Sequence, residues 1–199
     1  HGGVDLERFH PCSPGVIKER YEINDYLLCV GEVRPYKNME NVFRALELWS
    51  DGPQLAISGN ILGNHKAKLE NLARSLNIEN RVTWLGYVPD DLLSNLYSEA
   101  AAFIFPSLYE GFGLPILEAM ACGCPTLSSN MASLPEIGGK AAHFFDPKEI
   151  GDMAEAIKKV CEDSVYRQKL AQGGPKHAKK FSWESSTKKH MDLFETVLN

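Results

Sequence analysis

The sequence lacks an apolar run near the ~20 residues that a membrane-spanning helix needs. Its first residues, HGGVDLERFHPC, have no apolar core and do not begin with Met, so we expect neither a signal peptide nor a natural start at residue 1. Basic residues are in deficit, with 21 Lys and Arg against 26 Asp and Glu. The resulting net charge of −5 argues against a nucleic-acid-binding protein.

Cysteines are few and do not form the pairs of a secreted framework. There are 5, an odd number, and Cys29 and Cys122 lie inside apolar runs where buried free thiols are common. The spacing Cys122-Gly-Cys124 is not C-x-x-C and no second ligand pair follows, which argues against a metal site. We therefore expect a cytoplasmic protein with reduced thiols, and leave open a peripheral association of the full-length protein with the cytoplasmic face of a membrane.

Short β-rich apolar runs alternate with longer segments of helical periodicity. The runs are continuous, as in strands that are covered on both faces. The predicted strands are Tyr26–Gly31, Gln54–Ser58, Arg81–Leu85, Ala101–Phe105, Pro125–Ser128 and Ala141–Phe145. The predicted helices are Met39–Trp49, Asn64–Leu76, Asp91–Glu99, Pro115–Cys122, a turn near Ser133–Ile137, Glu149–Glu162, Val165–Lys179 and Trp183–Leu198. This alternation predicts an α/β fold, a doubly wound parallel Rossmann-like sheet of about six strands with helices on both faces.

The loop after the first strand carries two basic residues, Arg34 and Lys37. Ligands of such sheets bind beyond the carboxyl ends of the strands, so this loop belongs to the expected binding edge. A guanidinium and an ammonium there suit a diphosphate, although most Arg and Lys side chains are merely exposed. Asn38 is predicted to cap the helix that begins at Met39.

The stretch YEGFGLPILEAMACGCP, residues 109–125, has the features of an anion site. Pro115 suits the first helical position, and amides near Leu114, Ile116 and Leu117 are expected to have no partner inside the helix. Gly111 and Gly113 allow the backbone to approach a ligand closely. A helix start of this kind is well suited to phosphate.

Two glutamates, Glu110 and Glu118, bracket that anion site. Helical side chains lean toward the N-terminus, so Glu118 is expected to reach back toward the same ligand. Carboxylates repel phosphate but accept hydrogen bonds from hydroxyls, which predicts a ligand with phosphate in the middle and polyols at both ends, as in a nucleotide sugar. Each glutamate alone could equally be a solvated loop residue or a helix-start charge favoured by the dipole.

Three segments together carry a family resemblance. They are G-x-x-R-x-x-K-N from Gly31, EGFGLPILEAMACGCP from Glu110, and SLPEIGGKAAHFFDP from Ser133. In this order they resemble the C-terminal, donor-binding domain of GT-B glycosyltransferases, specifically the retaining family 4, the glycosyl transferases group 1. The resemblance implies that the sheet is the C-terminal half of a GT-B fold.

The same resemblance divides the chain into three parts. Residues 1–22 would lead in, as an irregular segment, from a missing N-terminal domain, residues 23–180 would bind the nucleotide sugar, and residues 181–199 would form a helix that crosses back to the missing domain. Ser182 suits the N-cap of this helix. Its apolar-leaning stripe comprises Trp183, Thr187, Met191, Phe194 and Leu198. Trp183, like Trp49 and Trp84, fits a core position better than a sugar-stacking platform.

Site residues follow from the resemblance, position by position. Arg34 and Lys37 match the basic pair that binds the donor diphosphate, Glu110 the glutamate near the donor sugar, and Glu118 the glutamate that holds ribose hydroxyls. In GYVPDD, Tyr87 and Val88 match the neighbours of the nucleobase, while Asp90 and Asp91 are read as a helix-start pair. The implied donor-binding set is Gly31, Arg34, Lys37, Tyr87, Val88, Glu110, Gly111, Phe112, Gly113, Leu114 and Glu118, with Glu110, Arg34 and Lys37 as the catalytic residues. ISGNILGNHKAKL departs from the tighter glycine loop of many relatives, so no contacts are carried over for Gly59 to Asn64.

The implied function is donor binding in a retaining hexosyltransferase. The full-length enzyme would transfer a hexose, with mannose as one option, from a nucleotide diphosphate sugar to an acceptor hydroxyl in glycan or polysaccharide biosynthesis. It would need no metal and no cofactor, and the missing domain would supply the site for a carbohydrate or lipid-linked acceptor. The isolated chain would be inactive. Two alternatives stay open, a GT-B nucleotide-sugar 2-epimerase and a non-catalytic nucleotide-binding regulatory module; a Rossmann oxidoreductase is disfavoured because no G-x-G-x-x-G follows the first strand.

Overall fold

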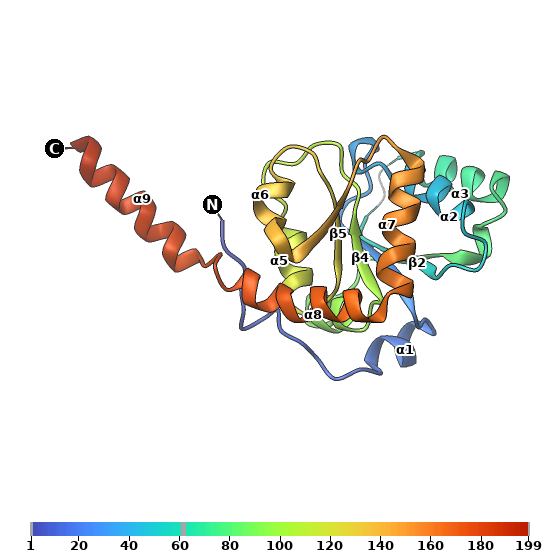
Figure 1. The fold of residues 1–199 in the computed structure, drawn as a ribbon, viewed down its shortest axis with the longest axis horizontal. Helices are drawn as coiled ribbons and strands as arrows, with labels where there is room; N and C mark the ends of the chain where they lie inside the picture. Colours follow the sequence, from blue (N-terminus) through green and yellow to red (C-terminus); the bar gives the residue numbers. More distant parts are fainter. Residues whose placement is uncertain (1, 61–62, 199) are drawn as a thin grey trace.

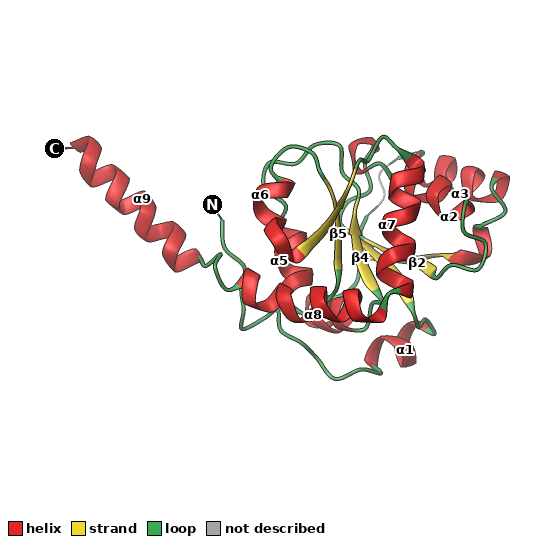
Figure 2. Ribbon diagram, viewed as in Figure 1, coloured by secondary structure: helices red, strands yellow, loops and turns green. Residues whose placement is uncertain are grey.

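A computed structural model describes residues 2–60 and 63–198 of the chain, and in them the predicted fold class is confirmed. Six parallel strands form one sheet in the order β3-β2-β1-β4-β5-β6, with helices packed on both faces (Figures 1 and 2). The strands are β1 Tyr26–Val30, β2 Gln54–Ser58, β3 Val82–Gly86, β4 Ala102–Phe105, β5 Thr126–Ser129 and β6 Ala142–Phe145. Each bound lies within one residue of the prediction.

Successive residues of the central strands pack into two separate hydrophobic cores, one on each face of the sheet. In β1, Leu28 packs in a core with residues of α4 Leu93–Ser98, α5 Leu114–Ala121 and α6 Leu134–Gly138. Leu27 and Cys29 pack on the opposite face with α2 Met39–Glu47, α3 His65–Ser75 and α7 Ile150–Glu162. Because both faces are covered, the strand sequences are continuously apolar rather than alternating.

The N-terminal segment is more regular than the sequence predicted. It contains a short helix, α1 Val16–Tyr21, where residues 1–22 had been expected to be irregular. The carboxylate of Glu99 accepts from the amides of Ile17 and Lys18 at 3.0 and 3.4 Å, and the Ile17 side chain is fully buried. The helix is stabilised by these tertiary contacts, which a local sequence pattern does not encode.

The chain ends in two long helices that differ in their surroundings. Helix α8, Ser164–Ala178, packs along α5, whereas α9, Trp183–Leu198, extends away from the body of the domain (Figure 1). The predicted cap of α9 is confirmed, since Ser182 Oγ accepts from the Ser185 amide at 3.1 Å. The prediction of a core position is wrong for Trp183, which is 54% exposed because α9 leaves the domain at that residue.

The two ends of the domain lie side by side. The amide of Val4 donates to the Phe181 carbonyl at 2.9 Å, and a Cβ on Gly3 would lie 2.2 Å from the Trp183 nitrogen. Within the described ranges, none of the helices combines the length and the apolar character that a membrane crossing requires.

Candidate functional site

The candidate site lies where the sheet order reverses. Strands β1 and β4 are paired in the middle of the sheet, yet α2 follows β1 on one face and α5 follows β4 on the other. The loops after these strands therefore diverge and leave the crevice in which α/β sheets bind ligands. A hydrogen bond of 2.8 Å from the Leu108 amide to the Tyr36 carbonyl joins the two loops.

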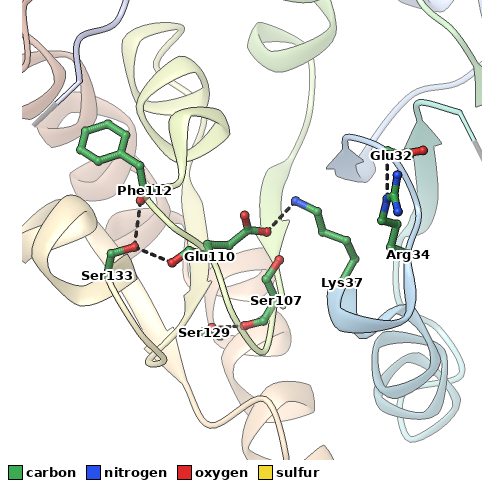
Figure 3. A network of polar contacts seen from close by, with 8 residues as sticks. All are labelled: Glu32, Arg34, Lys37, Ser107, Glu110, Phe112, Ser129 and Ser133. Atoms are coloured by element: carbon green, nitrogen blue, oxygen red, sulfur yellow. Dashed lines mark hydrogen bonds and ion pairs between the residues drawn. The ribbon is translucent and has the colours of Figure 1, made fainter.

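Lys37 and Glu110 meet across this crevice. Lys37 Nζ donates to Glu110 Oε1 at 2.6 Å, and the two side chains are only 15% and 16% exposed (Figure 3). The ammonium also lies 4.5 Å from the centroid of the Phe105 ring and 5.6 Å from that of Tyr36. A largely buried cation with a single carboxylate partner is a strong attachment point for a phosphate oxygen.

Asn38 fixes the position of Lys37 in a way that the sequence did not reveal. The prediction of a side-chain cap is wrong: Asn38 occupies the N-cap position of α2 but makes no capping bond with its side chain. Its Nδ2 donates instead to the carbonyls of Pro106 and Pro147 at 3.3 and 2.8 Å. Asn38 thus ties the β1 loop to the loops after β4 and β6, because buried carbonyls there need donors.

Arg34 is not brought to the Lys37–Glu110 pair. Its Nε donates to Glu32 Oε2 at 2.7 Å, and the two side chains are 47% and 38% exposed. In Figure 3 Arg34 lies beside Glu32, with Lys37 between it and Glu110. To contact an anion that is held by Lys37, the guanidinium would have to leave Glu32.

The glycine turn after Glu110 leads directly into helix α5. Gly113 has φ +101°, and a Cβ there would lie 2.8 Å from Leu134 Cδ2, so only glycine fits. Pro115 lies in the first turn of α5, but as its second residue and not its first as predicted, because the helix begins at Leu114. The prediction of an unpartnered amide is wrong for Ile116, which donates to the Gly113 carbonyl at 3.0 Å because the first turn is tightened.

Ser133 holds this glycine turn in place. Its hydroxyl lies 3.1 Å from the Glu110 carbonyl and 3.2 Å from the Phe112 carbonyl, so its single proton is shared between them (Figure 3). The Phe112 ring points away from the Glu110 carboxylate and packs edge-on against Phe181, with the ring centroids 6.4 Å apart. Phe112 therefore contributes its backbone, and not its ring, to the crevice.

A second hollow adjoins the first at the ends of β1, β2 and β3. It is a cleft of about 460 Å³ whose lining includes Gly31, Gly59, Tyr87, Val88 and Asp90. Gly59 has φ +131°, and a Cβ there would lie 2.1 Å from the Gly31 carbonyl oxygen, so the two loops approach as closely as glycine allows. Tyr87 is 66% exposed while Val88 is buried. Residues 61–62 of the following loop lie outside the described residues.

Glu118 faces a different environment from Glu110. It lies one turn inside α5, where its Oε2 accepts from the Tyr97 hydroxyl at 2.9 Å. Burial raises the pKa of Glu118, and the hydrogen bond from Tyr97 and the positive charge of Arg8 counteract this rise. The structure therefore separates the two glutamates: Glu110 contacts Lys37, and Glu118 lies among Tyr97, Arg8 and Asp90.

Several residues of the site were missed by sequence reasoning. Asp90, which was read only as a helix-start charge, forms an ion pair with Arg8 at 3.2 Å. Tyr97 and Ser133 act through contacts that span 21 to 23 residues. None of these pairings has a local sequence signal, because each depends on how the loops are folded together.

Metal ligands do not cluster in the part of the chain that the structure describes: no group of three His, Cys, Asp or Glu side chains lies close enough to hold an ion. The cysteines in it are free thiols. Burial raises the pKa of Cys29 and of Cys122 to about 12, so these thiols stay protonated.

Comparison with known proteins gives the family. Residues 17–177 match the family described as Glycosyl transferases group 1. The chain belongs to this family. The match spans most of the chain and includes both loops of the crevice, so the resemblance drawn from the motifs is confirmed.

Relatives of this glycosyltransferase domain are longer proteins. It is 35% identical over 94% of its length to the O-antigen chain mannosyltransferase B of Escherichia coli, of which it covers 50%. Among solved structures, it matches sucrose-phosphate synthase from Thermosynechococcus elongatus with a TM-score of 0.86 and 25% identity, covering 99% of this chain and 51% of that one. It also matches Anabaena HepE, solved in complex with UDP, with a TM-score of 0.85 and 21% identity over 98% of this chain and 56% of that one. The chain thus spans about half the length of these proteins and has the fold of the C-terminal domain of a GT-B enzyme.

Proposed function

We propose that this chain is the donor-binding domain of a retaining glycosyltransferase that transfers a hexose from a nucleotide diphosphate sugar to an acceptor hydroxyl. The observation that carries the proposal is the Lys37–Glu110 pair, 2.6 Å apart at the switch point of the sheet and beside the start of α5. It joins a cation for phosphate to a carboxylate for hydroxyls, which are the two kinds of group that a sugar phosphate presents.

The cationic groups have the role of stabilising the leaving diphosphate. Negative charge grows on that group as the bond to the sugar breaks, and Lys37 and the backbone of residues 111–114 would receive it, with Arg34 joining them once its guanidinium leaves Glu32. Electrostatic stabilisation of this kind can do the work that a metal ion does in other transferases. We therefore propose that donor binding needs no divalent metal.

The remaining parts of the donor have separate places along the crevice. Glu110 would accept hydrogen bonds from hydroxyls of the donor sugar, and Glu118 from those of the ribose. The nucleobase would occupy the cleft that Gly31, Tyr87 and Val88 line. HepE is solved with UDP, and this supports a nucleoside diphosphate as the donor's common part.

Transfer itself would require a second domain. We propose that residues 1–22 lead in from an acceptor-binding N-terminal domain and that residues 181–199, which include α9, return to it. The exposure of Met191, Phe194 and Val197, between 54% and 75%, supports this proposal. The full-length protein would be a cytoplasmic enzyme of glycan or polysaccharide biosynthesis, peripheral to the membrane, and mannose is the first sugar to test because the named relative is a mannosyltransferase.

The substitution Lys37→Ala tests the proposal in the isolated chain. The loss of one charge-assisted contact should weaken the binding of a nucleoside diphosphate by about 1.5–3 kcal/mol, roughly 10- to 100-fold. Binding of the nucleoside without phosphates should change little. Titration calorimetry with GDP, UDP and ADP, and with their nucleosides, measures both quantities.

Lys158→Ala is the matched control, because Lys158 is exposed on α7, away from the crevice. An equal loss for nucleoside and nucleoside diphosphate in Lys37→Ala would contradict a phosphate role. Detectable sugar transfer by the 199-residue chain alone would contradict the need for a second domain.

A further inference from the structure

A turn in the N-terminal segment presents Arg8 to the candidate site. Asp5 Oδ1 accepts from the amides of Glu7 and Arg8 at 3.0 and 3.1 Å, and the Phe9 amide donates to the Asp5 carbonyl at 2.8 Å. The hydroxyl of Ser94 donates to the Arg8 carbonyl at 2.5 Å. The turn is thus closed on itself and attached to α4, although it precedes the sheet by many residues.

The Arg8 guanidinium contacts the rim of the cleft beside β3. Its Nη2 lies 3.2 Å from Asp90 Oδ2 and 3.4 Å from the Asp90 carbonyl oxygen. Asp90 lines the cleft together with Tyr87, whose hydroxyl lies 3.5 Å from Asp90 Oδ1. A residue of the N-terminal segment therefore contacts both the carboxylate and the backbone of Asp90 at the rim of the cleft.

The residue after Arg8 contacts the hydrogen-bond partner of Glu118. Phe9 is buried and packs edge-on against the ring of Tyr97, with the ring centroids 6.2 Å apart. Tyr97 in turn donates to Glu118. The turn thus contacts both acidic residues at this end of the crevice, Asp90 through Arg8 and Glu118 through Phe9 and Tyr97.

We propose that Arg8 is a positioning residue for the nucleoside end of the donor site: its guanidinium holds Asp90 at the rim of the cleft, and the turn that carries it packs Phe9 against Tyr97, the hydrogen-bond donor to Glu118. This inference rests on the proposed function. It makes the N-terminal segment a part of the site and not only a connection to it.

The charges around Glu118 determine how its acceptor role depends on pH. The titratable groups that face it are Tyr97 from α4, Asp90 from the β3 loop, Arg8 from the N-terminal turn and Cys122 at the end of α5. Burial raises the pKa of Glu118, Asp90 raises it further, and Tyr97 and Arg8 lower it. Ribose binding should be lost as pH falls through this pKa, and removal of the Arg8 charge should shift the loss to higher pH.

The test uses Arg8→Gln in the 199-residue chain, with Arg8→Lys as the rescue variant. Arg20→Gln is the matched control, because it removes the same charge from an exposed position on helix α1. Calorimetry between pH 5 and pH 8 compares whichever of GDP, UDP and ADP binds best with its 2′,3′-dideoxy analogue. We expect Arg8→Gln to weaken the ribose nucleotide about 3- to 10-fold at pH 7, a modest effect because the Arg8 side chain is 39% exposed.

Three results separate the possible failures. The role of Arg8 is supported if Arg8→Gln weakens binding of the ribose nucleotide but not of the dideoxy analogue. The pH at which half of the ribose nucleotide's affinity is lost should then also rise, and Arg8→Lys should bind like the parent chain. An unchanged affinity for the ribose nucleotide in Arg8→Gln, with the same melting temperature as the parent chain, overturns that role while the proposed function stands. If the parent chain binds none of the three nucleoside diphosphates, the proposed function and this inference both fail.

Discussion

Substitution of Glu110 by Gln should have opposite effects on two ligands of the same site. In the free protein the carboxylate of Glu110 occupies Lys37 at 2.6 Å. A diphosphate that approaches Lys37 competes with this carboxylate for the ammonium and is repelled by its negative charge. Glu110→Gln removes the competing charge but keeps the shape of the side chain and an oxygen that accepts from Lys37.

The magnitude follows from the kinds of hydrogen bond involved. A charge-assisted bond contributes about 1.5–3 kcal/mol and a neutral one about 0.5–1.5 kcal/mol. Both side chains are about five-sixths buried, so solvent should screen their interaction only slightly. The difference between the charge-assisted and the neutral hydrogen bond, about 1 kcal/mol, should therefore appear almost in full in the measured free energies. The free energy of unfolding should fall by about 1 kcal/mol, and a nucleoside diphosphate should bind about fivefold more tightly.

The sugar-bearing donor should behave differently. A neutral amide accepts from sugar hydroxyls more weakly than a carboxylate does, so the gain at the diphosphate should be cancelled or reversed for the nucleotide sugar. Calorimetry with a nucleoside diphosphate and with its hexose conjugate measures the two affinities. Glu155→Gln, an equal charge change at an exposed position of α7, is the control.

A double substitution that includes Lys37 tests whether Glu110 and the diphosphate compete for its ammonium. In a Lys37→Ala background, Glu110→Gln should no longer tighten the binding of the nucleoside diphosphate, because the competition it relieves is gone. If Glu110→Gln instead weakens the nucleoside diphosphate and the nucleotide sugar equally, Glu110 serves to hold Lys37 in position and the competition argument is wrong.

Four further predictions concern stability, pH, motion and metal. Gly173→Ala should stabilise the domain by about 0.5–1 kcal/mol, because the added Cβ meets open space in α8. Gly174→Ala should destabilise it by about 1–3 kcal/mol, because the added Cβ would lie 2.9 Å from the Met120 carbonyl oxygen. Denaturant titrations in which both variants change the free energy of unfolding in the same direction would contradict this prediction. Burial lowers the pKa of His143, so near pH 6.5 the imidazole binds a proton in the unfolded chain but not in the folded one. The free energy of unfolding should therefore fall as pH drops below about 7. Denaturant titrations at pH 7.5 and pH 5.5 should show a smaller fall for His143→Gln than for the parent chain. Amides 191–198 should exchange quickly in the monomer or be protected only at high concentration, and strong protection at every concentration would show that the end of α9 belongs to this domain alone. EDTA should leave nucleoside diphosphate affinity unchanged in calorimetry, and a large loss on chelation would refute the metal-free proposal.

The sequence by itself determined the order and the extent of the strands and of most helices. Apolar runs, helical periodicity and the positions of glycine and proline act over a few residues, so they identify β1 to β6, the loops at the binding edge and the first turn of α5 at Pro115. The same local chemistry identified Lys37 as a candidate for binding a diphosphate and Glu110 as a candidate for binding hydroxyls. It did not show α1, because that helix is held by Glu99 from a distant part of the chain.

Only the tertiary structure decided which candidates share a partner. Lys37 and Glu110 are 73 residues apart and meet because β1 and β4 are neighbours in the sheet. Arg34 has the right charge and lies three residues away from Lys37, yet it pairs with Glu32 at the surface. Arg8, which no motif marked, reaches Asp90 across 82 residues. The physical reason is that periodicity and sterics fix each element locally, whereas side-chain pairing depends on the packing that brings separate loops to one edge of the sheet.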